Sequence, residues 1–96
     1  MDILHVHYSG KQPRALYLLY LGSQNDKLVG IDITKFSDNE KKMTLSHIDD
    51  LDSLSIDKLI LWFKTHCPTA YKTGLKQIYK TNVKVIDKIP LNKLKS

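Results

Sequence analysis

The chain has 96 residues, of which 42% are hydrophobic and 26% are charged, and its formal net charge at pH 7 is +5. This length allows one domain, residues 1–96, with one modest core, and it predicts no deep substrate cavity. The composition excludes wholesale disorder, and the single cysteine, Cys67, excludes an internal disulfide and a cysteine-built zinc site.

The sequence predicts a cytoplasmic protein with no membrane partner. Its longest apolar stretch, residues 59–63, is far too short to cross a bilayer. The opening residues, MDILHVHY, lack the basic start and the long apolar run of a signal peptide. A lone cysteine also fits a reducing compartment.

Three strands are predicted in the first third of the chain. Residues 2–8 alternate between apolar and polar side chains, which is typical of a strand, and residues 9–13 have turn chemistry. Residues 14–21 are rich in aromatic and aliphatic side chains, which predicts a second strand buried on both faces. Residues 27–33 form the third strand of an antiparallel meander, where Gly30 indicates a bulge or a close backbone approach.

A capping box predicts where the first helix begins. Ser37 would accept a hydrogen bond from the amide of Glu40, whose carboxylate would reach back to the amide of Ser37. The helix is expected to end near Ile48 and to direct Met43 and His47 toward the core.

A second helix is predicted from Ser53 or Ser55 to about His66. Pro68 would stop it, because the residue before a proline resists the helical conformation. Its apolar contacts would come from Leu59, Ile60, Trp62 and Phe63.

The last third is harder to assign. Residues 69–79 fit a short helical turn, which Gly74 weakens. Residues 82–89 alternate as a final strand with Lys84 and Lys88 on its outward face, and residues 90–94 suit a terminal turn of helix. The prediction is therefore an α+β domain: a small bent antiparallel sheet, or a partial SH3-like barrel, with two helices inserted between the third and last strands.

No catalytic residue, metal site or cofactor is predicted, so the protein is not expected to be an enzyme. His5 and His7 share a strand face, but no spacing specifies a third ligand, so two solvated histidines on an edge strand are favoured. His66 and Cys67 are adjacent, which rarely places a base and a nucleophile in productive geometry. The acidic connector of residues 49–53 lacks the glycine and distal glutamate of a calcium-binding loop.

Positive charge gathers at one end of the sequence. From Lys64 onward there are eight lysines against one acid, a net charge of +7, whereas the first 63 residues carry a net charge of −2. Such asymmetry favours a polyanion on one side of the domain, although the same lysines would also serve solubility alone. The predicted nucleic-acid-binding residues are Arg14, Tyr71, Lys72, Lys76, Tyr79, Lys80, Lys84 and Lys88. Five of them are lysines spaced four residues apart, and together they are expected to form one basic surface.

Two segments carry a resemblance to a known group. Residues 28–36, LVGIDITKF, precede the predicted helices, and residues 71–75, YKTGL, lead to the final Ile89-Pro90. In these segments the chain resembles a loose group of small tailed-phage proteins that includes those related to the DNA end protector. The resemblance implies an SH3-like barrel with inserted helices, encoded by a bacteriophage and associated with DNA or with a host protein in the host cytoplasm.

Two functions of different classes follow. The first is a non-enzymatic nucleic-acid-binding protein that uses the basic last third. The alternative is a viral inhibitor or adaptor that binds a host protein. A homodimer is also predicted, because one chain of this size is not expected to bury both Trp62 and Phe63.

Overall fold

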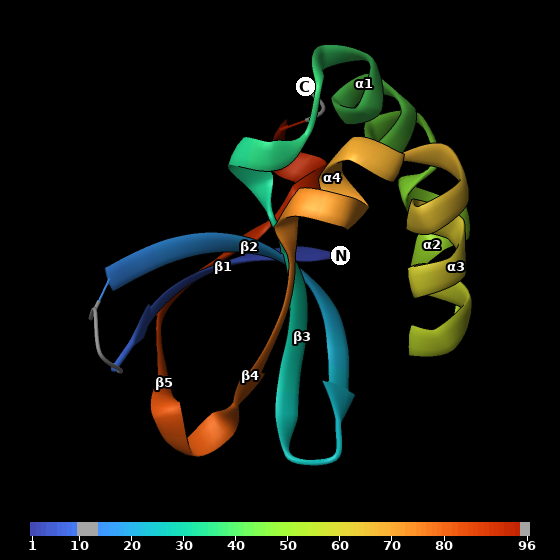
Figure 1. Ribbon diagram of the computed structural model, residues 1–96. Helices are drawn as coiled ribbons and strands as arrows, with labels where there is room; N and C mark the ends of the chain where they lie inside the picture. The colour runs from blue at the N-terminus through green and yellow to red at the C-terminus, as the bar shows by residue number, and fades with distance from the viewer. Residues whose placement is uncertain (10–13, 95–96) are drawn as a thin grey trace.

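The computed structural model describes residues 1–9 and 14–94. Five strands form one bent antiparallel sheet in the order β4-β3-β2-β1-β5 (Figure 1). This sheet and its helices confirm the predicted α+β class; most of the turn expected over residues 9–13 lies outside the described residues. The strands are β1 (Asp2–Tyr8), β2 (Arg14–Gln24), β3 (Lys27–Asp32), β4 (Leu75–Tyr79) and β5 (Val83–Pro90).

The predicted meander of the first three strands is confirmed. β2 pairs with β1 through its first half and with β3 through its second half, and a register shift between Tyr20 and Gly22 interrupts the pairing with β3. The turn into β3 is tighter than expected, because Asn25 and Asp26 both adopt positive φ angles, of 51° and 62°. Such pairs of residues make the two-residue turns whose twist matches the flanking strands.

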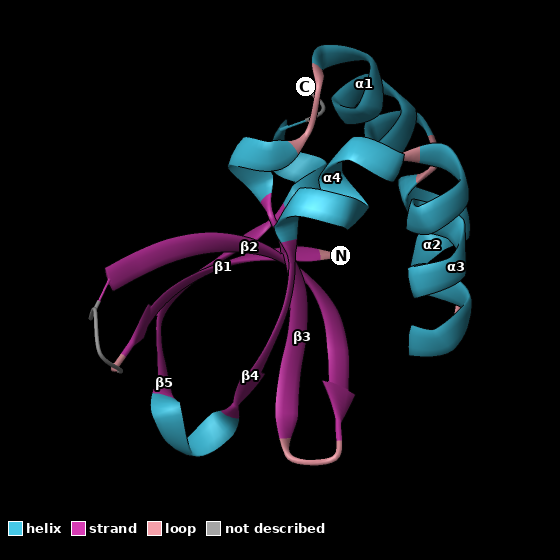
Figure 2. Cartoon of the chain, in the orientation of Figure 1, coloured by secondary structure: helices cyan, strands magenta, loops and turns pink. Residues whose placement is uncertain are grey.

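β2 is less buried than its composition suggested. Only Leu18, Leu19 and Leu21 are buried, whereas Tyr17 is 44% exposed. The prediction that this strand is buried on both faces was wrong for its first half, because the helices cover only the part of the sheet that β2 shares with β3 (Figure 2).

The helices lie between β3 and β4 and gather on one side of the sheet (Figure 2). The two predicted helices are present as α1 and α3, and two shorter ones accompany them. Pro68 stops α3 as expected, but it also starts the next helix at a position where its missing N–H is harmless. The insert comprises η1 (Ile33–Lys35), α1 (Asp38–Ser46), α2 (Ile48–Asp52), α3 (Ile56–His66) and α4 (Pro68–Gly74).

The capping box of α1 is confirmed. The Ser37 hydroxyl accepts from the Glu40 amide at 3.2 Å, and the Ser37 amide donates to Glu40 Oε1 at 3.0 Å. The inward face of α1, however, carries Glu40 and Thr44, whereas Met43 is exposed. Glu40 is tolerated there because its second oxygen, Oε2, accepts a hydrogen bond from the Thr69 amide of α4 at 3.0 Å.

The sheet has an apolar cluster on each face. The face toward the helices carries the larger cluster, with Leu19 and Ile31 packed against Phe36 and Phe63. Trp62 lies edge-on to Phe63 at 5.0 Å and packs against the same cluster. Both rings are therefore accommodated within one chain, so the observation that motivated the homodimer does not hold; dimerisation itself stays a prediction.

The second cluster fills the inside of the bend, and it consists of Leu4, Val6, Leu18 and Leu28. Gly30 lies at this bend, where a Cβ atom would come within 3.0 Å of the Leu19 carbonyl oxygen. The predicted close backbone approach is thus confirmed. After β5, residues Leu91–Leu94 form the expected helical turn, η3.

Candidate nucleic-acid interface

The structure distributes the predicted lysines over several elements. Lys72 is exposed on α4, near the helical side of the molecule, whereas Lys80 is exposed in η2 (Lys80–Asn82), the turn that joins β4 to β5. In Figure 1 this turn lies at the end of the sheet away from the helices. Lys76 of β4 is half-buried, opposite Gly30 and on the face of the inner cluster. The five lysines do not form one surface.

A bulge divides the two lysines of β5. Lys84 lies opposite His7 and Lys88 lies opposite Leu4, with a register shift between His5 and Val6. Residues directly opposite one another in a sheet project to the same face, and His7 and Leu4 project to different faces. The prediction that Lys84 and Lys88 share a face was therefore wrong, because the bulge leaves Ile86 without a partner residue and shifts the alternation.

Lys88 also differs from the other lysines in its charge environment. Its ammonium group lies 3.4 Å from the Asp2 carboxylate, which partly neutralises it. Tyr71, expected to stack on bases if exposed, is half-buried in α4. These two residues and Lys72 lie outside the surface described next.

The cations and tyrosines around η2 gather at one end of the sheet, here called the η2 rim. One end is held by the Lys80 amide, which donates to the Asp26 carbonyl at 2.9 Å, and by Lys27, whose ammonium lies 4.9 Å from the centre of the Tyr79 ring. The rim comprises Tyr8, Arg14, Lys27, Tyr79, Lys80 and Lys84.

The other end of the η2 rim is held by β1. The Ser9 amide donates to the Asn82 carbonyl at 3.1 Å, and Tyr8 lies opposite Val83 of β5 and Arg14 of β2. The Arg14 guanidinium lies 5.5 Å from the centre of the Tyr8 ring. Four cations and two tyrosines thus lie at the end of the sheet around η2, on both of its faces, with Asp26 as a neighbouring acid.

Sequence reasoning missed Lys27 and Tyr8 as members of this surface. Lys27 joins Tyr79 only because β4 pairs with β3, and β4 was not recognised as a strand. The available signal was the alternation of Leu75, Gln77 and Tyr79 with Lys76 and Ile78, which also fits a short strand.

Among the described residues, the metal sites considered from the sequence do not gather a set of ligands. β1 lies between β2 and β5 and is not an edge strand, and His5 stacks on Tyr17 at 4.3 Å between ring centres. Across residues 1–9 and 14–94, no group of three or more histidine, cysteine or acidic side chains could hold a metal ion.

The Cys67 thiol is fully buried, and burial raises its pKa. The nearby Glu40 carboxylate raises that pKa further, whereas the hydrogen bond with Thr44 opposes the shift. Its neighbour His66 instead stacks on Trp62 at the surface. This supports a packing role for Cys67, since the thiolate is the reactive species.

Comparisons found no matching family model, no matching curated protein and no matching solved structure. The resemblance to small phage proteins therefore stays a prediction. In the part of the chain that the structure describes, no helix has the length and apolar character needed to cross a membrane.

Proposed function

We propose that the protein is a small non-enzymatic nucleic-acid-binding protein that uses the η2 rim. The observation that carries this proposal is the gathering of Arg14, Lys27, Lys80 and Lys84 at one end of the sheet, with Tyr79 53% exposed among them. Lysine neutralises phosphate as a mobile point charge and reads no bases, so binding is salt-sensitive and largely independent of sequence.

Tyrosine adds a preference for single strands. An exposed ring can stack on an unpaired base, which is worth roughly 1–3 kcal/mol per base. Tyr79 is the ring best placed for this, since Tyr8 is half-buried beside Arg14. The remaining residues expected from the sequence have secondary roles in this proposal, and they are Lys72, Lys76, Lys88 and Tyr71.

The phage origin belongs to the same proposal. The short 3₁₀ turn between the two edge strands, together with the strand order, supports a partial SH3-like barrel as the resemblance implies. A phage-encoded protein of this kind would meet nucleic acid in the host cytoplasm.

Salt titration of matched variants tests the proposal. We expect K80Q/K84Q to weaken binding of a labelled single strand by a similar factor for every sequence, and to flatten the plot of log K against log salt by about 1.4 units if both lysines neutralise phosphates. The control K58Q/K64Q removes the same charge from exposed positions on α3. It should behave like the unchanged protein. If no strand binds at low salt, or if both pairs weaken binding equally, the η2 rim is not the binding surface.

A second candidate function is binding to a host protein, and the exposure of β5 favours it. This strand pairs with β1 on one side only and leaves Val85 and Ile86 about half exposed, at 48% and 53%. An edge of this kind can accept a strand from a partner through main-chain hydrogen bonds. Purification from cells separates the two functions: nucleic acid leaves at high salt, whereas a partner held by β5 stays bound and is lost in V85K/I86K.

A further inference from the structure

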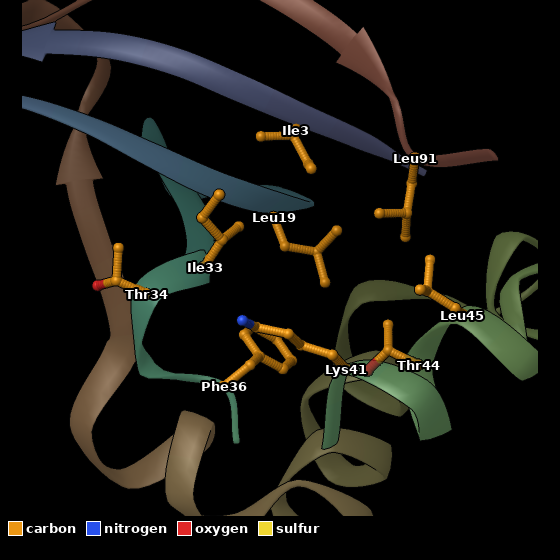
Figure 3. Close-up of a pocket in the computed structure, with 9 residues that line it drawn as sticks. All are labelled: Ile3, Leu19, Ile33, Thr34, Phe36, Lys41, Thr44, Leu45 and Leu91. Atoms are coloured by element: carbon orange, nitrogen blue, oxygen red, sulfur yellow. The ribbon is translucent and has the colours of Figure 1, made fainter. Parts of the chain in front are cut away.

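A cavity of about 370 Å³ lies between the sheet, η1 and α1 (Figure 3). Its walls are apolar and come from distant parts of the chain: Ile3, Leu19, Phe36, Leu45 and Leu91. A volume in this range is typical of small-molecule sites.

One cation lies at this cavity. Figure 3 shows the Lys41 side chain extending from α1 past Phe36, with its amino group directed toward the side of Ile33. Two ion pairs are present within residues 1–9 and 14–94, and the Lys41 ammonium takes part in neither. The adjacent Glu40 carboxylate is directed elsewhere, to the amides of Ser37 and Thr69.

The hydroxyl groups of the lining are already used. Thr44 donates to the Glu40 carbonyl at 2.9 Å, and Thr34 donates to the Asp32 carboxylate at 2.7 Å. The cavity thus combines apolar walls with one cation, the exposed Lys41, that has no ion-pair partner among the described residues. Such a site is complementary to a molecule with an apolar tail and one negative charge.

We propose that this cavity binds an alkyl carboxylate, with the tail among Leu19, Phe36 and Leu45 and the carboxylate on the Lys41 ammonium. A single cation matches a monoanion better than a phosphate dianion. The volume corresponds to about twelve water molecules, and a methylene group is slightly smaller than a water, so a chain of about eight to ten carbons fits. The site is separate from the η2 rim, because α1 and η2 lie at opposite ends of the molecule (Figure 1).

Titration with decanoate tests the proposal. Calorimetry measures the binding, and the amide NMR shifts of Phe36 and Leu45 locate it. We expect a dissociation constant on the order of 0.1 mM. Hexanoate, which is four methylenes shorter, should bind about 250-fold more weakly, because each buried methylene contributes about fourfold. Decanol, which has the tail without the charge, should bind about three- to tenfold more weakly than decanoate.

Two single variants then identify the charge. K41M keeps the length of the side chain and should reduce decanoate binding to the level of decanol, without changing decanol binding. K42M removes the neighbouring exposed lysine of the same helix and should bind decanoate as the unchanged protein does. Equal losses in K41M and K42M would overturn the assignment to Lys41. Absence of decanoate binding in the low millimolar range, or shifts confined to residues outside the cavity, would overturn the site.

Discussion

Replacement of Glu40 by glutamine or alanine is expected to loosen α4 from α1. Glu40 is 7% exposed as a residue, and its carboxylate accepts hydrogen bonds from two amides, those of Ser37 and Thr69, at 3.0 Å each. A hydrogen bond to a charged group is worth about 1.5–3 kcal/mol, and part of this range is lost where water reaches the partner. We therefore expect E40A to lower the free energy of unfolding by about 2–4 kcal/mol, and E40Q by about 1–2 kcal/mol.

Urea unfolding at pH 7 measures these losses. We expect the urea concentration at the unfolding midpoint to be about 1–3 M lower in E40A. The dependence of the free energy of unfolding on urea concentration should be unchanged, because unfolding exposes the same surface area. The exposed Asp38, in the same first turn of α1, provides the control: D38N should lower the free energy of unfolding by only about 0.3–1 kcal/mol. A glutamine variant as stable as the unchanged protein would refute the link between α1 and α4.

The pH dependence supplies the second check. Burial acts to raise the pKa of Glu40, but the hydrogen bonds of Ser37 and Thr69 outweigh it and hold that pKa below the ordinary value of 4.5. A lowered pKa gives stability that is present above the ordinary value and is lost as the pH falls through the lowered one. The difference in the free energy of unfolding between the unchanged protein and E40Q should therefore disappear at acid pH. Circular dichroism, which reports the loss of helices and strands, is the probe for unfolding at each pH. A difference that stays constant down to acid pH would contradict the assigned ionisation.

Three other outcomes are expected. The Cys67 thiol, buried and with a raised pKa, should not react with a disulfide reagent until the protein unfolds in urea; fast reaction in the native state would contradict its burial. D26G should raise the free energy of unfolding by about 0.5–1 kcal/mol, since glycine adopts the positive φ of this turn without strain; thermal unfolding would show the gain, and a loss would mean that the Asp26 side chain stabilises the turn. S37A should lower the free energy of unfolding by about 1 kcal/mol, because the Glu40 amide loses its acceptor; a neutral result in urea would show that water replaces the cap.

The elements predictable from the sequence were those with local signals. The capping box at Ser37 marked the start of α1 correctly, and alternation located β1, β3 and β5 to within a residue or two. By contrast, α4 and β4 meet at Gly74 and Leu75 with no polar break between them. A Cβ atom at Gly74 would come within 3.1 Å of the Ile31 side chain. This glycine therefore permits close packing of α4 on β3, which only the tertiary structure reveals.

The residue types of the candidate site were predictable, but their arrangement was not. Counting charges identified the lysines of the last third, and the four-residue spacing then suggested one surface. The bulge at Ile86 has no sequence signature of its own, because it depends on how β5 pairs with a strand about 80 residues earlier. Lys27 likewise belongs to the η2 rim only because β3 pairs with β4 across the helical insert.

The position of β1 has a consequence for the order of folding. This strand pairs with β2, which follows it closely, and with β5, where Asp2 lies opposite Pro90 and the Met1 carbonyl accepts from the Leu91 amide at 2.8 Å. Closure of so long a loop lowers the folding rate more than the final stability. A growing chain can therefore form the meander of β1, β2 and β3 early, but β1 keeps one unpaired edge until residues 83–90 have been synthesised. During that interval the edge can pair with another chain, so production at lower temperature or with a chaperone should increase the yield of monomer from the same sequence.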